Sequence, residues 1–233
     1  MDSVVYPDFP YSHVYAIKEV VEKIPADSVL HLSINDSIRI TNFFKLNPRI
    51  KTYANIGTHG IDGCLSSFLG QAAAGNKQSY LVIGDLAFFY DMNAMRLRHI
   101  KNNVHILLIN NEGGSEFYFN HMWKDEASDL HTTARHHTKA EGWVKSNNFI
   151  YLSAHDKESM QEALKEFMRS DLEKPVFLEV FTEMKTDSDV IYDFFDLSRP
   201  KDVQSETIRR SKEFIKATIG QEKAQKIAGL FKK

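Results

Sequence analysis

Two short, continuous apolar runs constrain the fold of this 233-residue chain more than any other feature. They are Tyr80-Leu81-Val82-Ile83 and Ile106-Leu107-Leu108-Ile109, and polar turn residues stop both. Runs of this length and composition are typical of strands buried on both faces of a parallel sheet. Parallel neighbours need a crossover connection, and the intervening residues predict a helix over about residues 91–101. The sequence therefore predicts a strand-helix-strand unit.

The rest of the chain continues this alternation. Apolar periodicity predicts helices over residues 13–23, 61–74 and 157–169, and strands over 29–33, 52–55, 148–152 and 175–181. Such alternation indicates an α/β fold, a doubly wound parallel sheet flanked by helices. Beyond Asp187, residues 205–216 and 221–232 have apolar residues spaced for amphipathic helices. We therefore expect a domain over residues 1–187 and a helical C-terminal extension over 188–233, which caps the domain or binds a partner chain or membrane.

Polar groups follow both apolar runs, in Gly84-Asp85-Leu86-Ala87 and in Asn110-Asn111-Glu112-Gly113-Gly114. The carboxyl ends of neighbouring parallel strands line the crevice in which such sheets bind ligands. The Asp85 carboxylate, the Asn111 amide oxygen and the Gly113 carbonyl are hard ligands suited to a Mg²⁺ ion that also holds phosphate oxygens. A helix cap at Asp85 and an asparagine turn are the ordinary alternatives. The two motifs together favour a metal-diphosphate site.

This arrangement of Gly-Asp and Asn-Asn, some two dozen residues apart, resembles the cofactor motif of thiamine diphosphate (ThDP)-dependent enzymes. The segment from Tyr53 to Gly63, which contains Gly60-Ile61-Asp62-Gly63, is similar to the MenD family of menaquinone-pathway synthases. The resemblance covers residues 12–183. It implies the ThDP-binding fold, ThDP and Mg²⁺ as cofactors, and a transferase or lyase that decarboxylates a 2-oxo acid and joins the product to an acceptor.

The same resemblance assigns the cofactor site. Asp85, Asn111 and Gly113 are the implied Mg²⁺ ligands, and Ile61 is the apolar wedge that bends ThDP, although a buried helix-start isoleucine is an equally ordinary role. Leu86 stands where the family commonly has glycine, and Ala87 where it often has serine. The implied cofactor-binding residues are Gly60, Ile61, Gly84, Asp85, Leu86, Ala87, Asn111, Gly113 and Gly114.

The residues expected to contact the substrate depart from the family. Asn35 and Arg39 fall where a serine and an arginine hold substrate carboxylates, and Arg39 keeps the bidentate fork suited to a carboxylate. Glu116 occupies an otherwise apolar position beside Phe117, and Ile56 replaces a second arginine. A dicarboxylate such as isochorismate would therefore meet fewer cations here. These changes favour a different acceptor.

The chain is long enough for one sizeable core but not for the three domains of a complete enzyme of this family. The resemblance implies that a separate pyrimidine-binding domain or chain supplies the catalytic glutamate, that this chain alone is inactive, and that the assembly is a homodimer or higher oligomer. Three hypotheses follow: the cofactor domain of a MenD-like carboligase, a subunit of a split 2-oxo acid decarboxylase with a non-menaquinone substrate, or a catalytically degenerate binding domain.

Composition narrows the remaining possibilities. A formal net charge of -2 gives no reason to expect nucleic acid as a partner, and there is neither a signal-like amino terminus nor an apolar run near twenty residues. We therefore expect a cytoplasmic protein without a membrane partner. The single cysteine, Cys64, is interpreted as a core residue. The polar segment with His131, His136 and His137 is interpreted as a solvated loop rather than a metal site.

Overall fold

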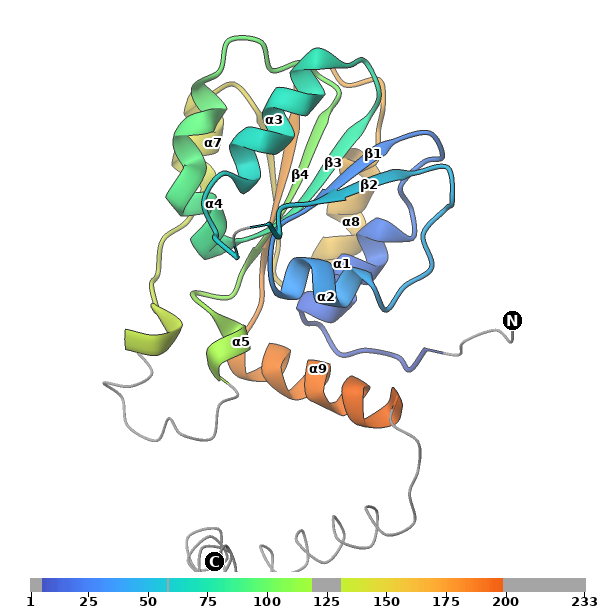
Figure 1. Cartoon of the computed structure of the whole chain (residues 1–233), viewed down its shortest axis with the longest axis vertical. Helices are drawn as coiled ribbons and strands as arrows, with labels where there is room; N and C mark the ends of the chain where they lie inside the picture. The colour runs from blue at the N-terminus through green and yellow to red at the C-terminus, as the bar shows by residue number, and fades with distance from the viewer. Residues whose placement is uncertain (1–5, 58, 119–130, 199–233) are drawn as a thin grey trace, which may run out of the picture. The chain divides into compact units, whose positions relative to one another are not determined.

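A computed structural model describes residues 6–57, 59–118 and 131–198, without the side chains of residues 196–198. Strands and helices alternate along it (Figure 1). The elements are α1 (His13–Val21), β1 (Val29–Leu32), α2 (Asp36–Thr41), β2 (Lys51–Ala54), α3 (Cys64–Ala74), β3 (Ser79–Gly84), α4 (Asp85–Asp91), η1 (Met92–Arg96), β4 (Val104–Asn110), α5 (Ser115–Tyr118), α7 (Glu141–Ser146), β5 (Ile150–Ala154), α8 (Lys157–Phe167), β6 (Val176–Phe181) and α9 (Met184–Ser198).

The described strands form a six-stranded sheet in the order β2-β1-β3-β4-β6-β5. Every pair of neighbours is parallel, so the predicted fold class is confirmed. From β1 the chain winds outward to β2 and then returns to β3 on the other side of β1. This reversal is the topological switch point, outside whose strand ends doubly wound proteins bind their ligands.

Helices cover both faces of the sheet, with α3, α4 and α7 on one face and α1 and α8 on the other (Figure 1). Alternate residues of β3 and β4 point to each face, and Leu81 and Ile83 pack in a buried cluster with Phe68 of α3 and Phe88 of α4. Cys64 belongs to the same cluster, as its interpretation as a core residue requires. The two-sided burial of β3 and β4 explains their unbroken apolar runs.

Two predicted helix boundaries are wrong. The crossover helix does not span residues 91–101: α4 begins at Asp85, directly after β3, and ends in the short η1 turn. A carboxylate in the first helical turn is favourable because it faces the positive end of the helix dipole. The helix expected from residue 61 begins at Cys64, because Gly63 has a left-handed φ of 72° that breaks the helical path before it.

The C-terminal region contains α9, which runs through the predicted domain boundary at residue 187. The chain divides into two compact units, Met1–Tyr192 and Asp193–Lys233. The predicted helices over 205–216 and 221–232 lie outside the described residues, so the extension stays a prediction. Among the described helices, none combines the length and apolar character that a membrane span requires.

His105 makes the stability of the core dependent on pH. Its ring is fully buried in β4, stacks on Tyr80 with ring centroids 4.5 Å apart, and places Nδ1 2.8 Å from the carbonyl oxygen of Phe167. Burial lowers its pKa to about 4, against about 6.5 in an unfolded chain. The unfolded state therefore takes up the proton first as the pH falls.

We expect the His105 contribution to the free energy of unfolding to be complete above pH 6.5 and to fall progressively towards pH 4, by about 2 to 3 kcal/mol in total. Urea denaturation at several pH values measures this. The His105→Gln variant should lose this part of the pH dependence, whereas exposed His137→Gln should keep it. Equal slopes in the wild type and His105→Gln would contradict the assignment.

Candidate cofactor site

A cavity of about 350 Å³ opens at the switch point. Its walls are the segments that follow β1, β3 and β4, with contributions from α1 and from residues 59, 61, 132 and 134. All three strands deliver their carboxyl ends to the same edge of the sheet because they are parallel neighbours in register. The cavity therefore lies where the topology predicts a ligand site.

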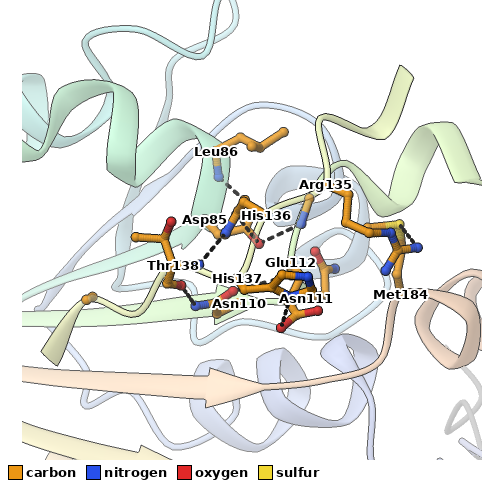
Figure 2. Close-up of polar contacts among 12 residues, drawn as sticks. Asp85, Leu86, Asn110, Asn111, Glu112, Arg135, His136, His137, Thr138 and Met184 are labelled. Atoms are coloured by element: carbon orange, nitrogen blue, oxygen red, sulfur yellow. Dashed lines mark hydrogen bonds and ion pairs between the residues drawn. The ribbon is translucent and has the colours of Figure 1, made fainter. Parts of the chain in front are cut away.

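Asp85 is a buried carboxylate that lines this cavity. It is the first residue of α4 and is 2% exposed. Its Oδ1 accepts a hydrogen bond from the Leu86 amide at 2.6 Å, and its Oδ2 accepts one from the Gly113 amide at 3.0 Å (Figure 2). The two motifs, 28 positions apart at these residues, thus meet directly across β3 and β4.

The two asparagines of the second motif have different roles. Asn110 turns away from the cavity, and its Nδ2 donates to the Glu179 carboxylate at 2.7 Å and to the Thr138 carbonyl at 2.9 Å. Asn111 lines the cavity, and its Nδ2 donates to Oδ2 of Asp187 at 2.9 Å. Because a carboxylate can only accept from it, Asp187 fixes the Asn111 amide with its nitrogen inward. The Asn111 oxygen is left as the group that can bind a ligand.

Asp187 is the buried acceptor that holds this edge of the site together. It is 0% exposed and receives hydrogen bonds from the backbone amide of His13 at 2.7 Å and the hydroxyl of Thr182 at 2.6 Å, besides that of Asn111. The contact with His13 joins residues 174 positions apart in sequence. The start of α1, the end of β6 and the second motif are therefore positioned by one carboxylate.

The His13 ring lies between two carboxylates. Its Nδ1 is 3.4 Å from Oδ1 of Asp187 and its Nε2 is 3.6 Å from Oδ2 of Asp36, and neither contact has hydrogen-bond geometry. Burial alone lowers the His13 pKa, but the two carboxylates outweigh it, so the net shift is upward. The same ion pair holds the pKa of Asp36 below its usual range against the effect of burial.

The segment carrying His136 packs beside the second motif rather than extending into solvent. The Gly114 amide donates to the Thr133 carbonyl at 2.7 Å, and the His136 amide donates to the Glu112 carbonyl at 3.0 Å. His136 Nε2 lies 3.3 Å from Oδ2 of Asp85 (Figure 2). Interaction with the Asp85 carboxylate raises the His136 pKa despite partial burial. The interpretation as a solvated loop is therefore wrong for His136, whose ring contacts Asp85, whereas His137 is 78% exposed as that interpretation expects.

The donor set fits a hard divalent cation. Asp85 supplies carboxylate oxygens, Asn111 an amide oxygen, and Gly113 a backbone carbonyl, which are the ligand types Mg²⁺ takes up together with phosphate and water. Within the described residues there is no cluster of three or more His, Cys, Asp or Glu side chains able to hold a metal ion. Among the three ligand candidates Asp85 alone offers a carboxylate, so a cation held by them would take its remaining ligands from neutral oxygens and from a bound molecule.

The backbone conformation and the close packing at position 113 require glycine. Its φ is 148°, and a Cβ built there would lie 2.6 Å from the Thr133 carbonyl oxygen and 2.9 Å from Cε of Met184. We expect Gly113→Ala to lower the free energy of unfolding by about 2 to 4 kcal/mol, through backbone strain and this overlap. Gly84→Ala is the matched control, because φ at Gly84 is -82° and a Cβ there would have no atom within 4 Å. Equal urea midpoints for the two variants would contradict this account.

The other predicted cofactor residues divide into two groups. Gly84, Leu86, Ala87, Gly114 and Ile61 line the cavity with the three ligand candidates. Ile61 also packs against the buried cluster of α3 and α4, and its role as a wedge beneath ThDP stays a prediction. Gly60 precedes Ile61 but is not among the lining residues. The cofactor-binding roles of these residues remain predictions.

The structure separates the predicted substrate residues. Asn35 has a φ of 67° at the N-cap of α2 and lines the cavity with Glu116 and Phe117. Arg39 does not line the cavity: its side chain is 47% exposed, and its Nη1 lies 2.5 Å from Oε1 of Glu116. Arg39, which was expected to bind a substrate carboxylate, thus forms an ion pair with Glu116 instead.

Comparison with known proteins finds curated relatives that share one name. No family model matches the chain. It is 38% identical over 191 residues to a 2-succinyl-5-enolpyruvyl-6-hydroxy-3-cyclohexene-1-carboxylate synthase of Bacteroides fragilis, a match covering 81% of this chain and 34% of the relative. Equally named synthases of Phocaeicola vulgatus and Bacteroides thetaiotaomicron are 35% and 36% identical, over 83% and 84% of the chain and 35% and 36% of the relatives.

The fold therefore places this chain among the doubly wound α/β domains, with an acidic site at the switch point. Within that class, the chain resembles the MenD-like, ThDP-dependent enzyme family, as its motifs predict. The chain spans about a third of the length of these relatives. For this chain, the activity of the complete relatives is therefore only proposed.

Proposed function

We propose that this chain is the Mg²⁺- and ThDP-diphosphate-binding part of a MenD-like 2-oxo acid decarboxylase and carboligase. The observation that supports it best is the direct contact between the two motifs, in which the Gly113 amide binds the buried Asp85 carboxylate beside Asn111. This contact makes one oxygen-rich site from residues that precede and follow the β3-β4 crossover. The limited share of each relative that the chain matches is consistent with a pyrimidine-binding part supplied by a further domain or a partner chain.

In this proposal the chain's residues bind and orient. Asp85, Asn111 and the Gly113 carbonyl would hold Mg²⁺ together with phosphate oxygens. Asp187 holds the Asn111 amide nitrogen and so leaves its oxygen for the cation, and Ile61 would contact the coenzyme from the cavity wall. When bound, ThDP supplies the carbon nucleophile that adds to a 2-oxo acid and accepts the electrons left when CO₂ departs. The catalytic glutamate comes from the pyrimidine-binding part.

A non-menaquinone substrate is the second candidate, and the Arg39-Glu116 ion pair favours it. Isochorismate is a dicarboxylate, and the arginine expected to receive one of its carboxylates is already paired. A 2-oxo acid decarboxylase with a different acceptor accommodates this pair without rearrangement.

Thermal unfolding of the full chain tests the cofactor proposal. We expect ThDP and Mg²⁺ together to raise Tm, because a ligand that binds only the folded state stabilises it by mass action. Thiamine monophosphate with Mg²⁺ is the matched control and should raise Tm far less, since it lacks the second phosphate. Equal shifts with both compounds, or a ThDP shift that persists in EDTA, would contradict a metal-diphosphate site.

A further inference from the structure

The two carboxylate oxygens of Glu116, which lines the cavity, have different surroundings. Oε1 of Glu116 contacts Nη1 of Arg39 at 2.5 Å, while Oε2 is buried and has no hydrogen-bond partner among the described residues. Buried polar atoms are almost always paired, because an unpaired one is unfavourable. The free oxygen is therefore suited to receive a donor from a molecule in the cavity.

This carboxylate is held in place from both sides. Glu116 belongs to α5, whose first residue, Ser115, donates to Oδ2 of Asp36 on α2 at 3.0 Å. The Ser115 carbonyl accepts from the Ser188 hydroxyl at 2.9 Å. Arg39 is on α2, one helical turn from Asp36, whose Oδ1 is 3.8 Å from its Nη1. The Arg39-Glu116 pair thus adds a second link between α2 and α5 to the one that Ser115 makes.

The charges around the guanidinium also oppose a second anion. Arg39 already faces the carboxylates of Asp36 and Glu116, so a ligand carboxylate would meet two anions there and would compete with Glu116 for Nη1. The Glu116 side chain is only 21% exposed, so losing its cation is unfavourable, although Arg39 itself is half exposed. Burial, opposed by Arg39, gives Glu116 a raised pKa, which fits a carboxylate short of donors.

We propose that Glu116 determines substrate specificity at this site. Its Oε1 pairs with Arg39, and its Oε2 is free to accept a hydrogen bond. The acceptor substrate therefore donates a hydrogen bond from a hydroxyl or amine group instead of presenting a carboxylate. This proposal names the substrate class for the proposed carboligase and rests on that function for its biological meaning. The binding preference itself is a property of the cavity and does not require Mg²⁺ or ThDP.

Nuclear magnetic resonance titration of the ¹⁵N-labelled full chain tests the preference without either cofactor. The probes are succinate, a dicarboxylate, and glycerol, a hydroxyl donor, and the readouts are the amide signals of α2 and α5. The wild type should show saturable shifts with glycerol and none with succinate. In Glu116→Gln, which frees Arg39, succinate should bind at least about tenfold more tightly than to the wild type, and Arg39→Gln added to it should remove that gain.

Two outcomes would overturn the proposal. One is succinate binding to the wild type as tightly as to Glu116→Gln, because Glu116 would then not be blocking Arg39. The other is a glycerol response that Glu116→Leu leaves unchanged. Arg39→Gln alone keeps the test valid if a Glu116 variant does not fold. The wild type should show no succinate response for this substitution to remove, and a wild-type succinate response that Arg39→Gln abolishes would show that Arg39 is available and overturn the proposal. Failure of ThDP to bind would leave these results standing, so the two proposals can fail separately.

Discussion

Asp85→Asn is expected to reduce the affinity of the chain for ThDP in the presence of Mg²⁺ by at least about 100-fold. The substitution removes the one carboxylate of the proposed ligand set at almost unchanged volume. It also replaces one acceptor oxygen with an NH₂ group, which would face the nitrogen atoms of Leu86, Gly113 or His136 that now contact the Asp85 oxygens. The variant should therefore lose stability as well, by about 1 to 3 kcal/mol.

Asp91→Asn separates these two effects. Asp91 ends the same helix, α4, and its Oδ2 accepts hydrogen bonds from the amide and hydroxyl of Ser66 at 2.7 and 2.8 Å, but it does not line the cavity. It should lower stability while changing ThDP affinity by less than about twofold. Calorimetric titration of both variants at saturating Mg²⁺ gives the comparison. Wild-type affinity in Asp85→Asn would show that this carboxylate does not hold the metal.

Asp187→Ala is expected to cause the largest stability loss in the chain, about 3 to 5 kcal/mol in the free energy of unfolding. The variant leaves the buried donors of His13 and Asn111, and the partly buried hydroxyl of Thr182, without their acceptor. It also leaves the His13 ring with Asp36 as its only neighbouring carboxylate among the described residues. Urea denaturation monitored by circular dichroism measures the loss.

Asp189→Ala is the matched control two residues further along α9. Asp189 is exposed and pairs with Lys185 across one helical turn, an arrangement worth less than about 0.5 kcal/mol. Asp187→Ala should also weaken Mg²⁺-dependent ThDP binding by about tenfold, because Asn111 is no longer held with its oxygen towards the cavity. A free energy of unfolding within about 1 kcal/mol of the control would refute the central role given to Asp187.

The parts of the fold that sequence could predict are those set by local pattern. The apolar runs of β3 and β4 identify strands buried on both faces, and their polar ends locate the ligand crevice. Helix boundaries were harder to predict from the sequence. The start of α3 depends on the left-handed conformation of Gly63, and the start of α4 depends on Asp85 following β3 directly. Short helices such as α2 and α5 have too few residues to show periodicity.

The residues that complete the site were missed for a different reason. His13, His136 and Asp187 contact partners far away in sequence, up to 174 positions for His13 and Asp187, and no local pattern records such contacts. An aspartate in the first turn of α9 reads as an ordinary helix-start residue. The departure at Glu116 was visible in the sequence, but only the structure shows that it pairs with Arg39.

Calorimetric titration of the purified chain with ThDP tests most directly whether the Gly-Asp and Asn-Asn motifs together form a metal-dependent diphosphate site. The titration is run with Mg²⁺, and again after EDTA has removed the metal. We expect one saturable site per chain with Mg²⁺ and none with EDTA. Binding of equal strength in both conditions would contradict such a site, because the phosphates would then be held by something other than a cation on Asp85 and Asn111.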